Sequence, residues 1–154
     1  MFALTHICLP VAAAVVMNVF ARRQGYGDPF TPWTYALVGL FGILPDLLHP
    51  HLYLHERLDS WSHGIPAVVA VTLLGGVIMA TQRHRVASVY ALMCVLAYGA
   101  HVGGDMISGG IRPWYPWSPV VWGTNWVPPG QWITLDILTT LFTAALFYVA
   151  RRPR

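Results

Sequence analysis

Long apolar runs alternate with short polar segments along the chain, and five of the apolar runs approach membrane-spanning length. They cover residues 2–21, 33–48, 65–81, 86–107 and 133–150. A helix needs roughly 20 residues to cross the hydrocarbon of a bilayer. None of the runs shows the alternation of polar and apolar residues that is typical of a barrel strand. Inside a bilayer their backbone N–H and C=O groups must therefore bond to one another within helices. The pattern predicts an all-α integral membrane bundle of about five transmembrane helices, the second of them short and broken at Pro45.

Composition is consistent with this prediction and indicates a single domain. Hydrophobic residues make up 56% of the 154-residue chain and charged residues 10%, too few to cover the surface of a water-soluble protein. All nine basic residues are arginines, several of them at segment ends, and they form no stripe, which argues against nucleic-acid binding. We expect one transmembrane domain over residues 1–154, with outer loops at 49–62 and 108–131. A homo-oligomer and a complex with a partner subunit are both compatible with this composition.

The arginines predict how the helices are oriented. Seven of the nine lie on one side of a five-span arrangement: Arg22, Arg23, Arg83, Arg85, Arg151, Arg152 and Arg154. By the positive-inside rule this side is cytoplasmic, which places the N-terminus outside and the C-terminus inside an inner (cytoplasmic) membrane. The first run has no basic segment before it and is followed by arginines, so we expect a spanning helix rather than a cleavable signal.

The predicted outer loop 108–131 is rich in glycine, proline and tryptophan. Its prolines rule out a continuous helix. Indole side chains such as Trp114 and Trp117 favour headgroup depth, where they combine apolar area with a hydrogen-bond donor. We interpret the loop as a lid over an outer site that binds membrane lipid, with Arg112 contacting a phosphate. An aromatic belt that takes no part in substrate binding is the alternative.

Ionisable residues gather at the outer ends of the predicted helices. His101 and Asp105 are spaced i, i+4, so on a helix both side chains leave one face a turn apart and can hold one ion. Asp46 and His49 are spaced i, i+3 on the turn that follows Pro45, which has the same effect. Two separate segments therefore each present a pair of metal-ligand side chains.

Two further histidines fall at the same height. His6 lies near the outer end of the first predicted helix, and His63 opens the third behind Ser62, a typical N-cap residue. Imidazoles with a few carboxylates suit a divalent ion such as zinc, with manganese or iron as alternatives, whereas calcium prefers oxygen ligands. The sequence therefore predicts a metal site on the non-cytoplasmic face. Two aspartates in the cluster argue against haem.

Each of these residues also has a simpler explanation. His101 and Asp105 are compatible with a hydrogen-bonded pair between helices, and Asp46 with a helix cap. A solvated loop face accounts for His51, His55, Glu56 and Asp59. Asp136 is compatible with a pair to Arg112 or to a backbone group. The convergence of four segments at one depth favours the metal hypothesis over these explanations.

Short motifs in the same order are typical of one family. They are Thr5-His6, Leu44-Pro45-Asp46 with His49-Pro50, Ser62-His63, and His101 to Asp105 followed by GGIRPWYPWS. The chain resembles the YdjM-type membrane-bound metal-dependent hydrolases over nearly its whole length. The resemblance implies a metal-dependent hydrolase. Two positions depart from the family pattern: Leu48 replaces the second acid of an LPD-x-DHP turn, and Leu58 replaces the first histidine of an HRG-x-THS turn. If these positions supply ligands in relatives, the resemblance implies a smaller site with one metal rather than two, unless His55 or Asp59 substitutes from a neighbouring position.

The preferred hypothesis is a membrane hydrolase that acts on a lipid or lipid-linked (phospho)ester at the outer leaflet. The predicted metal ligands are His6, Asp46, His49, His63, His101 and Asp105. Asp59, Glu56 and Asp136 are candidate general bases. The alternatives are a membrane metal-binding module without catalysis and a small partner subunit whose histidines are incidental.

Overall fold

The computed structural model describes residues 3–50, 53, 56–82 and 84–151, and within them the chain is all-helical. The five α-helices are α1 (Ala3–Arg23), α2 (Pro32–Leu48), α3 (Ile65–Thr81), α4 (Arg85–Ile107) and α5 (Trp132–Ala150). Three short 3-10 helices, η1 (Glu56–Asp59), η2 (Trp61–His63) and η3 (Pro129–Gln131), lie in the connections. The predicted all-α fold is confirmed, and each predicted run agrees with a helix to within two residues.

Within the described part of the chain, three helical segments are long and apolar enough to cross a membrane: Ala3–Arg23, Arg85–Ile107 and Pro129–Ala150. The helices α2 and α3 are apolar but shorter, at 17 residues each, about 25 Å at 1.5 Å per residue. Large apolar side chains are exposed along the helices, for example Leu73 at 65% and Leu141 at 62%. Such surfaces are expected where lipid rather than water surrounds the bundle.

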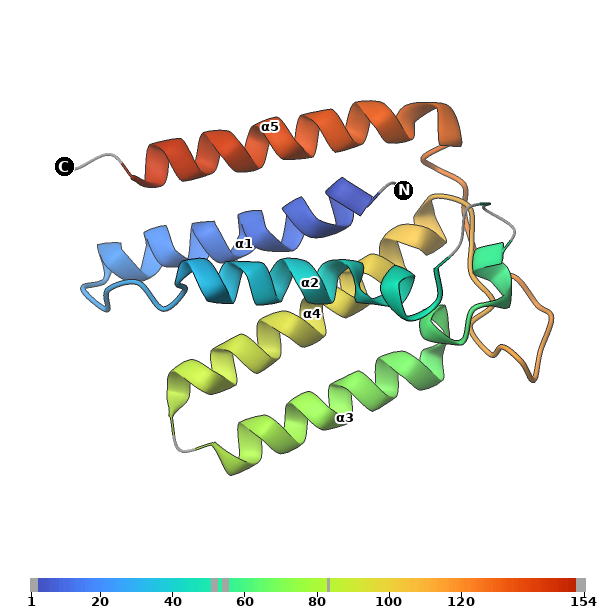
Figure 1. Cartoon of the computed structure of the whole chain (residues 1–154), viewed down its shortest axis with the longest axis horizontal. Helices are drawn as coiled ribbons and strands as arrows, with labels where there is room; N and C mark the ends of the chain where they lie inside the picture. The colour runs from blue at the N-terminus through green and yellow to red at the C-terminus, as the bar shows by residue number, and fades with distance from the viewer. Residues whose placement is uncertain (1–2, 51–52, 54–55, 83, 152–154) are drawn as a thin grey trace.

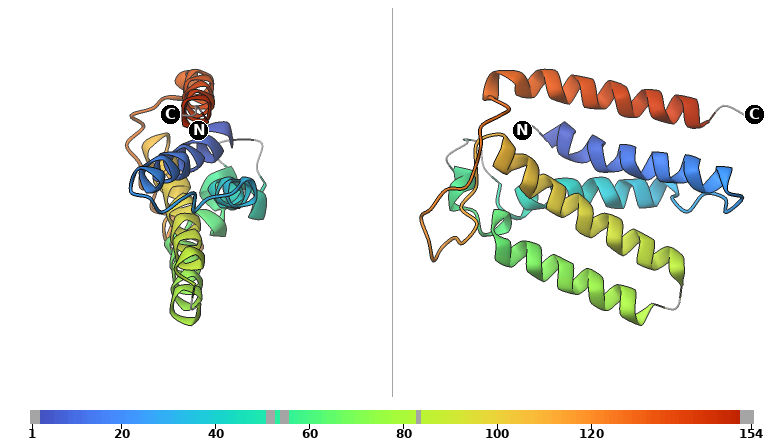
Figure 2. Two further views of the ribbon diagram at one scale, coloured as in Figure 1. Left: turned by 90° about the vertical axis from the view of Figure 1, so that its left-hand side faces the viewer. Right: turned by 180° about the vertical axis from the view of Figure 1, so that it is seen from behind.

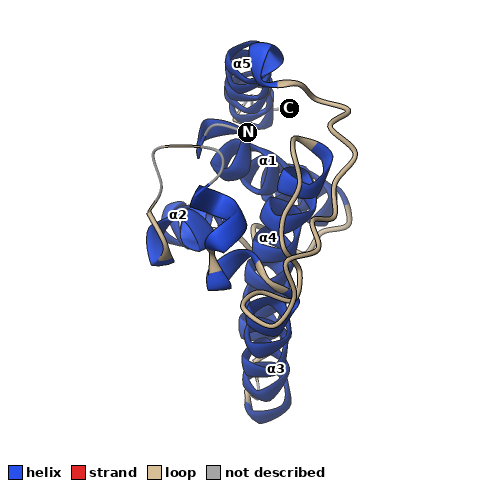
Figure 3. Ribbon diagram, turned by 90° about the vertical axis from the view of Figure 1, so that its right-hand side faces the viewer, coloured by secondary structure: helices blue, strands red, loops and turns tan. Residues whose placement is uncertain are grey.

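The helices lie nearly side by side along one long axis (Figure 1). Seen end-on, α5, α1, α4 and α3 form one row in this order, and α2 packs against α1 and α4 on one side of the row (Figure 2, left panel, and Figure 3). The helix α4 therefore lies at the centre of the bundle and contacts α1, α2 and α3. Two of the predicted metal ligands project from the outer end of this central helix.

The loops that follow α2 and α4 meet at one end of the molecule (Figure 1). The end of α1, the start of α4 and the end of α5 lie at the opposite end, which carries Arg22, Arg23, Arg85 and Arg151. The predicted separation of the arginines from the histidine-rich loops is thus present in the fold. The assignment of the arginine end to the cytoplasm stays a prediction.

The first turn of α1 is capped by a carboxylate from α5. The Thr5 N–H donates to Asp136 Oδ1 over 2.9 Å, and the Thr5 hydroxyl donates to the same oxygen. The first N–H groups of a helix have no partner within it, so Asp136 stabilises the start of α1, directly before His6. Further along the interface, the Thr143 hydroxyl donates to the carbonyl of Cys8 over 3.2 Å, a polar contact typical of membrane helices.

Two local predictions about helix ends are wrong. Pro45 does not break the second helix, because α2 continues to Leu48 and the Pro45 carbonyl accepts the His49 N–H at 3.3 Å. A proline in the last turn costs the helix few bonds. Ser62 does not cap the third helix either, since Gly64 is the N-cap residue of α3. The Ser62 hydroxyl instead donates to the Pro45 carbonyl over 2.7 Å and so joins η2 to the end of α2.

Close contact between α1 and α2 depends on Gly42. Pro10 lies inside α1 and has no N–H, so the His6 carbonyl lacks its usual partner within the helix. The glycine of α2 lies against this carbonyl: a Cβ added to Gly42 would meet His6 O at 2.1 Å and Pro10 Cγ at 3.0 Å. Only a residue without a side chain allows α2 to lie this close to α1.

We expect Gly42→Ala to reduce the free energy of unfolding by about 1–3 kcal/mol, because the new methyl group meets backbone atoms that cannot move aside. Thermal unfolding of the purified protein in detergent measures the change. Gly76→Ala in α3 is the matched control, since nothing lies within 4 Å of its added Cβ, and alanine favours a helix over glycine. Equal stability of the two variants would contradict the close packing of α1 on α2.

Candidate metal centre

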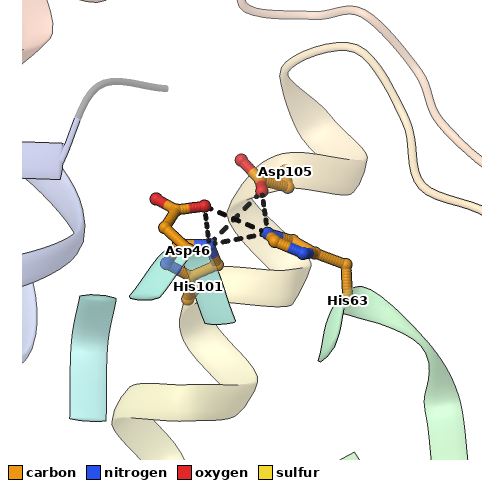
Figure 4. A group of neighbouring side chains, drawn as sticks. All are labelled: Asp46, His63, His101 and Asp105. Atoms are coloured by element: carbon orange, nitrogen blue, oxygen red, sulfur yellow. Dashed lines mark hydrogen bonds and ion pairs between the residues drawn. The ribbon is translucent and has the colours of Figure 1, made fainter. Parts of the chain in front are cut away.

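Four side chains from three parts of the chain converge at the loop end of the bundle. Asp46 comes from the last turn of α2, His63 from η2, and His101 and Asp105 from successive turns of α4 (Figure 4). One ligand atom from each residue lies within 4.8 Å of the other three. The i, i+4 spacing on α4 and the loop after α2 thus supply two acids and two imidazoles to one point.

Five of the six distances among these atoms are close to the edge length of a tetrahedron around a small metal ion. His63 Nε2 lies 3.1 Å from His101 Nε2, 3.2 Å from Asp46 Oδ1 and 3.3 Å from Asp105 Oδ2. His101 Nε2 lies 3.4 Å from both of these carboxylate oxygens. Ligands held at zinc distances of about 2.0–2.1 Å in a tetrahedron are separated by about 3.3 Å. The chain therefore presents four donor atoms at the spacing that one small divalent ion requires.

Hydrogen bonding fixes the tautomer of His101. Its Nδ1 lies 2.7 Å from the carbonyl oxygen of Gly42, and a carbonyl oxygen can only accept. The proton of the neutral ring is therefore on Nδ1, and Nε2 carries a lone pair directed at the cluster. A histidine that donates its other N–H to a backbone carbonyl is the common arrangement of a metal ligand. This hydrogen bond joins the outer half of α4 to α2 at Gly42, the same residue that lies close to α1.

A chain of hydroxyl groups fixes the tautomer of His63 in the same sense. The Ser62 hydroxyl proton goes to the Pro45 carbonyl, so Ser62 Oγ accepts from Ser60, 2.7 Å away. Because the Ser60 hydroxyl proton points to Ser62 Oγ, Ser60 Oγ can only accept from His63. It therefore accepts the His63 Nδ1–H over 2.9 Å. His63 Nε2 is then also unprotonated in the neutral ring. Ser60, Ser62 and His63 are all buried, so water does not replace these partners.

The two histidines therefore direct lone pairs at each other over 3.1 Å, with two carboxylate oxygens beside them. Four acceptors at this spacing repel one another unless protons or a cation lie between them. A site with two nitrogen and two oxygen donors suits zinc and similar divalent ions and is unlike an all-oxygen calcium site. The residues present therefore fit the divalent ion that the sequence predicts.

One side of the cluster is open. The side chains of His63, His101 and Asp105 are exposed by 1%, 0% and 2%, whereas that of Asp46 is exposed by 25%. A molecule that reaches the cluster must approach past Asp46, at the end of α2. The other three side chains are buried, with Gly42 of α2, His6 of α1 and Arg57 of η1 among their contacts.

His6 lies beside the cluster rather than within the group of four. Its ring stacks on His101 with centroids 3.8 Å apart. Its Nε2 is 3.4 Å from Asp105 Oδ1, the oxygen that faces away from the other histidines, and makes no hydrogen bond among the described residues. His49 is the C-cap residue of α2 and is not part of the group of four. His51 and His55 lie outside the described residues.

The candidate general bases occupy other positions. Asp59 forms an ion pair with Arg112, and both side chains are partly exposed at the loop end. Glu56 Oε2 accepts the Tyr53 N–H over 3.0 Å. Asp136 was expected to pair with Arg112 or with a backbone group. It accepts hydrogen bonds from the backbone N–H and the hydroxyl of Thr5, whereas Arg112 pairs with Asp59.

The outer loop after α4 folds back on itself. Ile111 and Trp122 form an antiparallel bridge, and the N–H of Ile65 donates to the Pro113 carbonyl over 2.8 Å. This contact joins the loop to the start of α3. Trp114 and Trp117 are exposed by 45% and 75%, as expected of indole side chains at headgroup depth.

Sequence reasoning missed Arg57, Ser60 and Gly42. Arg57 is 2% exposed and its Nη1 lies 2.7 Å from Asp105 Oδ1, although its position in a polar loop predicts a solvated residue. Ser60 and Gly42 act through the far nitrogens of His63 and His101. The repeated serines in SWSH, next to a candidate ligand, are the one signal in the sequence that pointed to such a partner.

The fold and this site define a class: a helical membrane protein with a buried cluster of histidine and aspartate side chains at one end. The chain belongs to the YdjM inner membrane protein family, whose model matches residues 1–154. The resemblance noted in the motifs is thus confirmed over the whole chain. Neither the comparison with curated proteins nor that with solved structures gave a match.

We expect Ser60→Ala to weaken zinc binding about 10- to 100-fold, because the variant removes the acceptor that holds the His63 Nδ1–H. Competition with a chromophoric chelator on the metal-free protein in detergent measures the dissociation constant. Ser88→Ala makes the same change near the start of α4, far from the cluster, and is expected to leave binding unchanged. An unchanged affinity in Ser60→Ala would remove the role assigned to the serine chain.

Proposed function

We propose that this protein is a membrane-embedded, metal-dependent hydrolase whose centre is formed by Asp46, His63, His101 and Asp105. The observation that carries the proposal is the pair of histidine Nε2 atoms 3.1 Å apart beside two carboxylate oxygens, with both Nδ1 atoms hydrogen-bonded away from the cluster. A divalent ion bound there supplies Lewis-acid chemistry, lowering the pKa of a water molecule and polarising an ester oxygen. Among the divalent ions, zinc suits the two imidazole and two carboxylate donors best.

The chain's own residues take distinct roles in this proposal. Asp46, as the exposed member of the cluster, is where substrate or water enters. Asp105 and His101 hold their positions on one face of α4, and Asp136 positions the turn that carries His6 by binding Thr5. The partly exposed pair of Asp59 and Arg112 is assigned to the polar part of the substrate, with the guanidinium available to a phosphate.

A lipid or lipid-linked (phospho)ester is the proposed substrate class. The exposed indoles of Trp114 and Trp117 lie in the loop at the same end as the cluster, where headgroups are found. An apolar groove of about 310 Å³ between α2, α3 and α4 is lined by Phe41, Val71 and Cys94, among others. Its lining residues lie mainly in the halves of these helices nearer the arginine-bearing end, away from the cluster, and the apolar lining suits an acyl or prenyl chain.

The second candidate function is a metal-binding module without catalysis. It is favoured by the observation that protein atoms already supply four corners around one point, since structural zinc sites are closed by protein ligands and catalytic sites keep a position for water. The exposure of Asp46 favours the enzyme, because this ligand is the one that can yield a position to substrate or water.

The activity prediction is tested on purified protein in detergent or nanodiscs, with a panel of phosphoester and carboxylester lipids. We expect release of product that a chelator abolishes and added zinc restores, and that His101→Ala lacks. Ser88→Ala serves again as the matched control. Bound metal without turnover on the panel would favour the binding module, and the absence of stoichiometric metal would refute both functions.

We also propose that the metal end of the bundle faces the non-cytoplasmic side of the inner membrane, following the arginine distribution. In a variant with Cys8 and Cys94 replaced by alanine, a membrane-impermeant maleimide applied to the periplasmic face is expected to label Ser118→Cys in the outer loop. Gln82→Cys, at the turn between α3 and α4, is expected to react only after the membrane is permeabilised. The reverse pattern would invert the topology.

A further inference from the structure

The two carboxylate oxygens of Asp105 face different partners. Oδ2 is 3.3 Å from His63 Nε2 and 3.4 Å from His101 Nε2, inside the group of four. Oδ1 points the other way, 2.7 Å from Arg57 Nη1 and 3.4 Å from His6 Nε2. A carboxylate that divides its oxygens in this way is suited to bridge two cations, as in hydrolases that use two metal ions about 3.5–4 Å apart. The fold therefore contains a second cation position, on the Oδ1 side of Asp105.

The guanidinium of Arg57 fills this second position. Besides the ion pair with Oδ1, its Nη2 donates to the carbonyls of Gly110 at 3.1 Å and Asp105 at 3.5 Å. The Arg57 and Asp105 side chains are exposed by 3% and 2%, so water screens this charge little. Arginine keeps its proton under all conditions relevant to a protein. A fixed positive charge therefore lies where a second metal ion would bind and repels such an ion.

Among the residues that the structure describes, ligands for a second ion are also few. On the Oδ1 side, His6 Nε2 lies 3.4 Å away and offers one imidazole nitrogen. Position 48, the last residue of α2, and position 58, within η1, are both leucine and offer no donor atom. One imidazole and one carboxylate oxygen, the latter already bound to a guanidinium, do not make a tight divalent site.

We propose that Arg57 is a built-in second cation: it takes the place of a second metal ion on Asp105, so that the centre holds a single divalent ion. This inference rests on the proposed metal centre. Arg57 is then a positioning residue that directs Oδ2 of Asp105 toward the ion and leaves Oδ1 neutralised. Because Arg57 belongs to η1 and Gly110 to the loop after α4, the same side chain joins both outer loops to the ligand helix.

The stoichiometry of metal binding tests the proposal on the full chain in detergent, without an affinity tag. Metal-free protein is titrated with Co²⁺, followed by its visible absorption, and with Zn²⁺, followed by mass spectrometry of the bound metal. We expect saturation at one ion per chain. Two ions per chain in the wild type would overturn the role of Arg57 while leaving the metal centre intact. No bound ion would instead refute the proposed function itself.

Variants at position 57 separate positioning from general stability. Arg57→Met keeps the stem and removes the charge, and we expect it to weaken binding of the first ion about 10- to 100-fold. Arg57→Lys restores the charge without the planar fork and is expected to recover part of this loss. The first-ion dissociation constant and the Co²⁺ spectrum are the readouts, because a merely structural role would change the unfolding temperature alone and so overturn the proposal.

Arg112→Met is the matched control for metal binding. Arg112 is the other arginine at this end described by the structure, and it pairs with Asp59 at the exposed rim rather than with a ligand. We expect its stoichiometry and dissociation constant to equal those of the wild type. An equal loss of affinity in Arg57→Met and Arg112→Met would show a general effect of positive charge and would overturn the specific role of Arg57.

Discussion

Repulsion among four acceptor atoms is the constraint on which the loop end of this protein depends. The Gly42 carbonyl and the Ser60 hydroxyl each take the Nδ1 proton of a histidine, so the lone pairs of His101 and His63 face one another beside two carboxylates. Burial prevents water from relieving the repulsion. A fold that retains such a cluster requires protons or a cation at its centre, and the metal proposal rests on this requirement together with the donor types and their spacing.

The bundle is built so that these atoms meet. The helix α4 contacts α1, α2 and α3 and carries two of the four donors on one face. Gly42 lets α2 lie against the His6 carbonyl, to which Pro10 cannot donate, and its own carbonyl accepts the Nδ1–H of His101. The packing of the helices and the protonation of the ligand are therefore coupled through one backbone position. Arg57 provides a comparable link for the outer loops, since it binds both Asp105 and Gly110.

Much of the architecture followed from the sequence. Apolar runs of nearly membrane-spanning length leave the helix as the only way to pair backbone groups, so all five α-helices were predicted with almost the observed bounds. The i, i+4 spacing of His101 and Asp105 required only helix geometry to place both on one face. The arginines predicted that Arg22 and Arg151 lie at the end of the bundle away from the cluster, because basic residues gather on one side of a membrane.

Other features were decided by contacts between residues distant in sequence. No local pattern reveals that Asp136 caps α1 across the bundle, that Arg57 is buried, or that Asp105 divides its oxygens between two sets of partners. The tautomers of the two histidines depend on acceptors that only the packed loops and helices bring within reach. The sequence by itself determined which segments are helices and which residue types gather at one end, because both follow from hydrophobicity and helical period. Tertiary structure decided which atoms meet and where each proton lies.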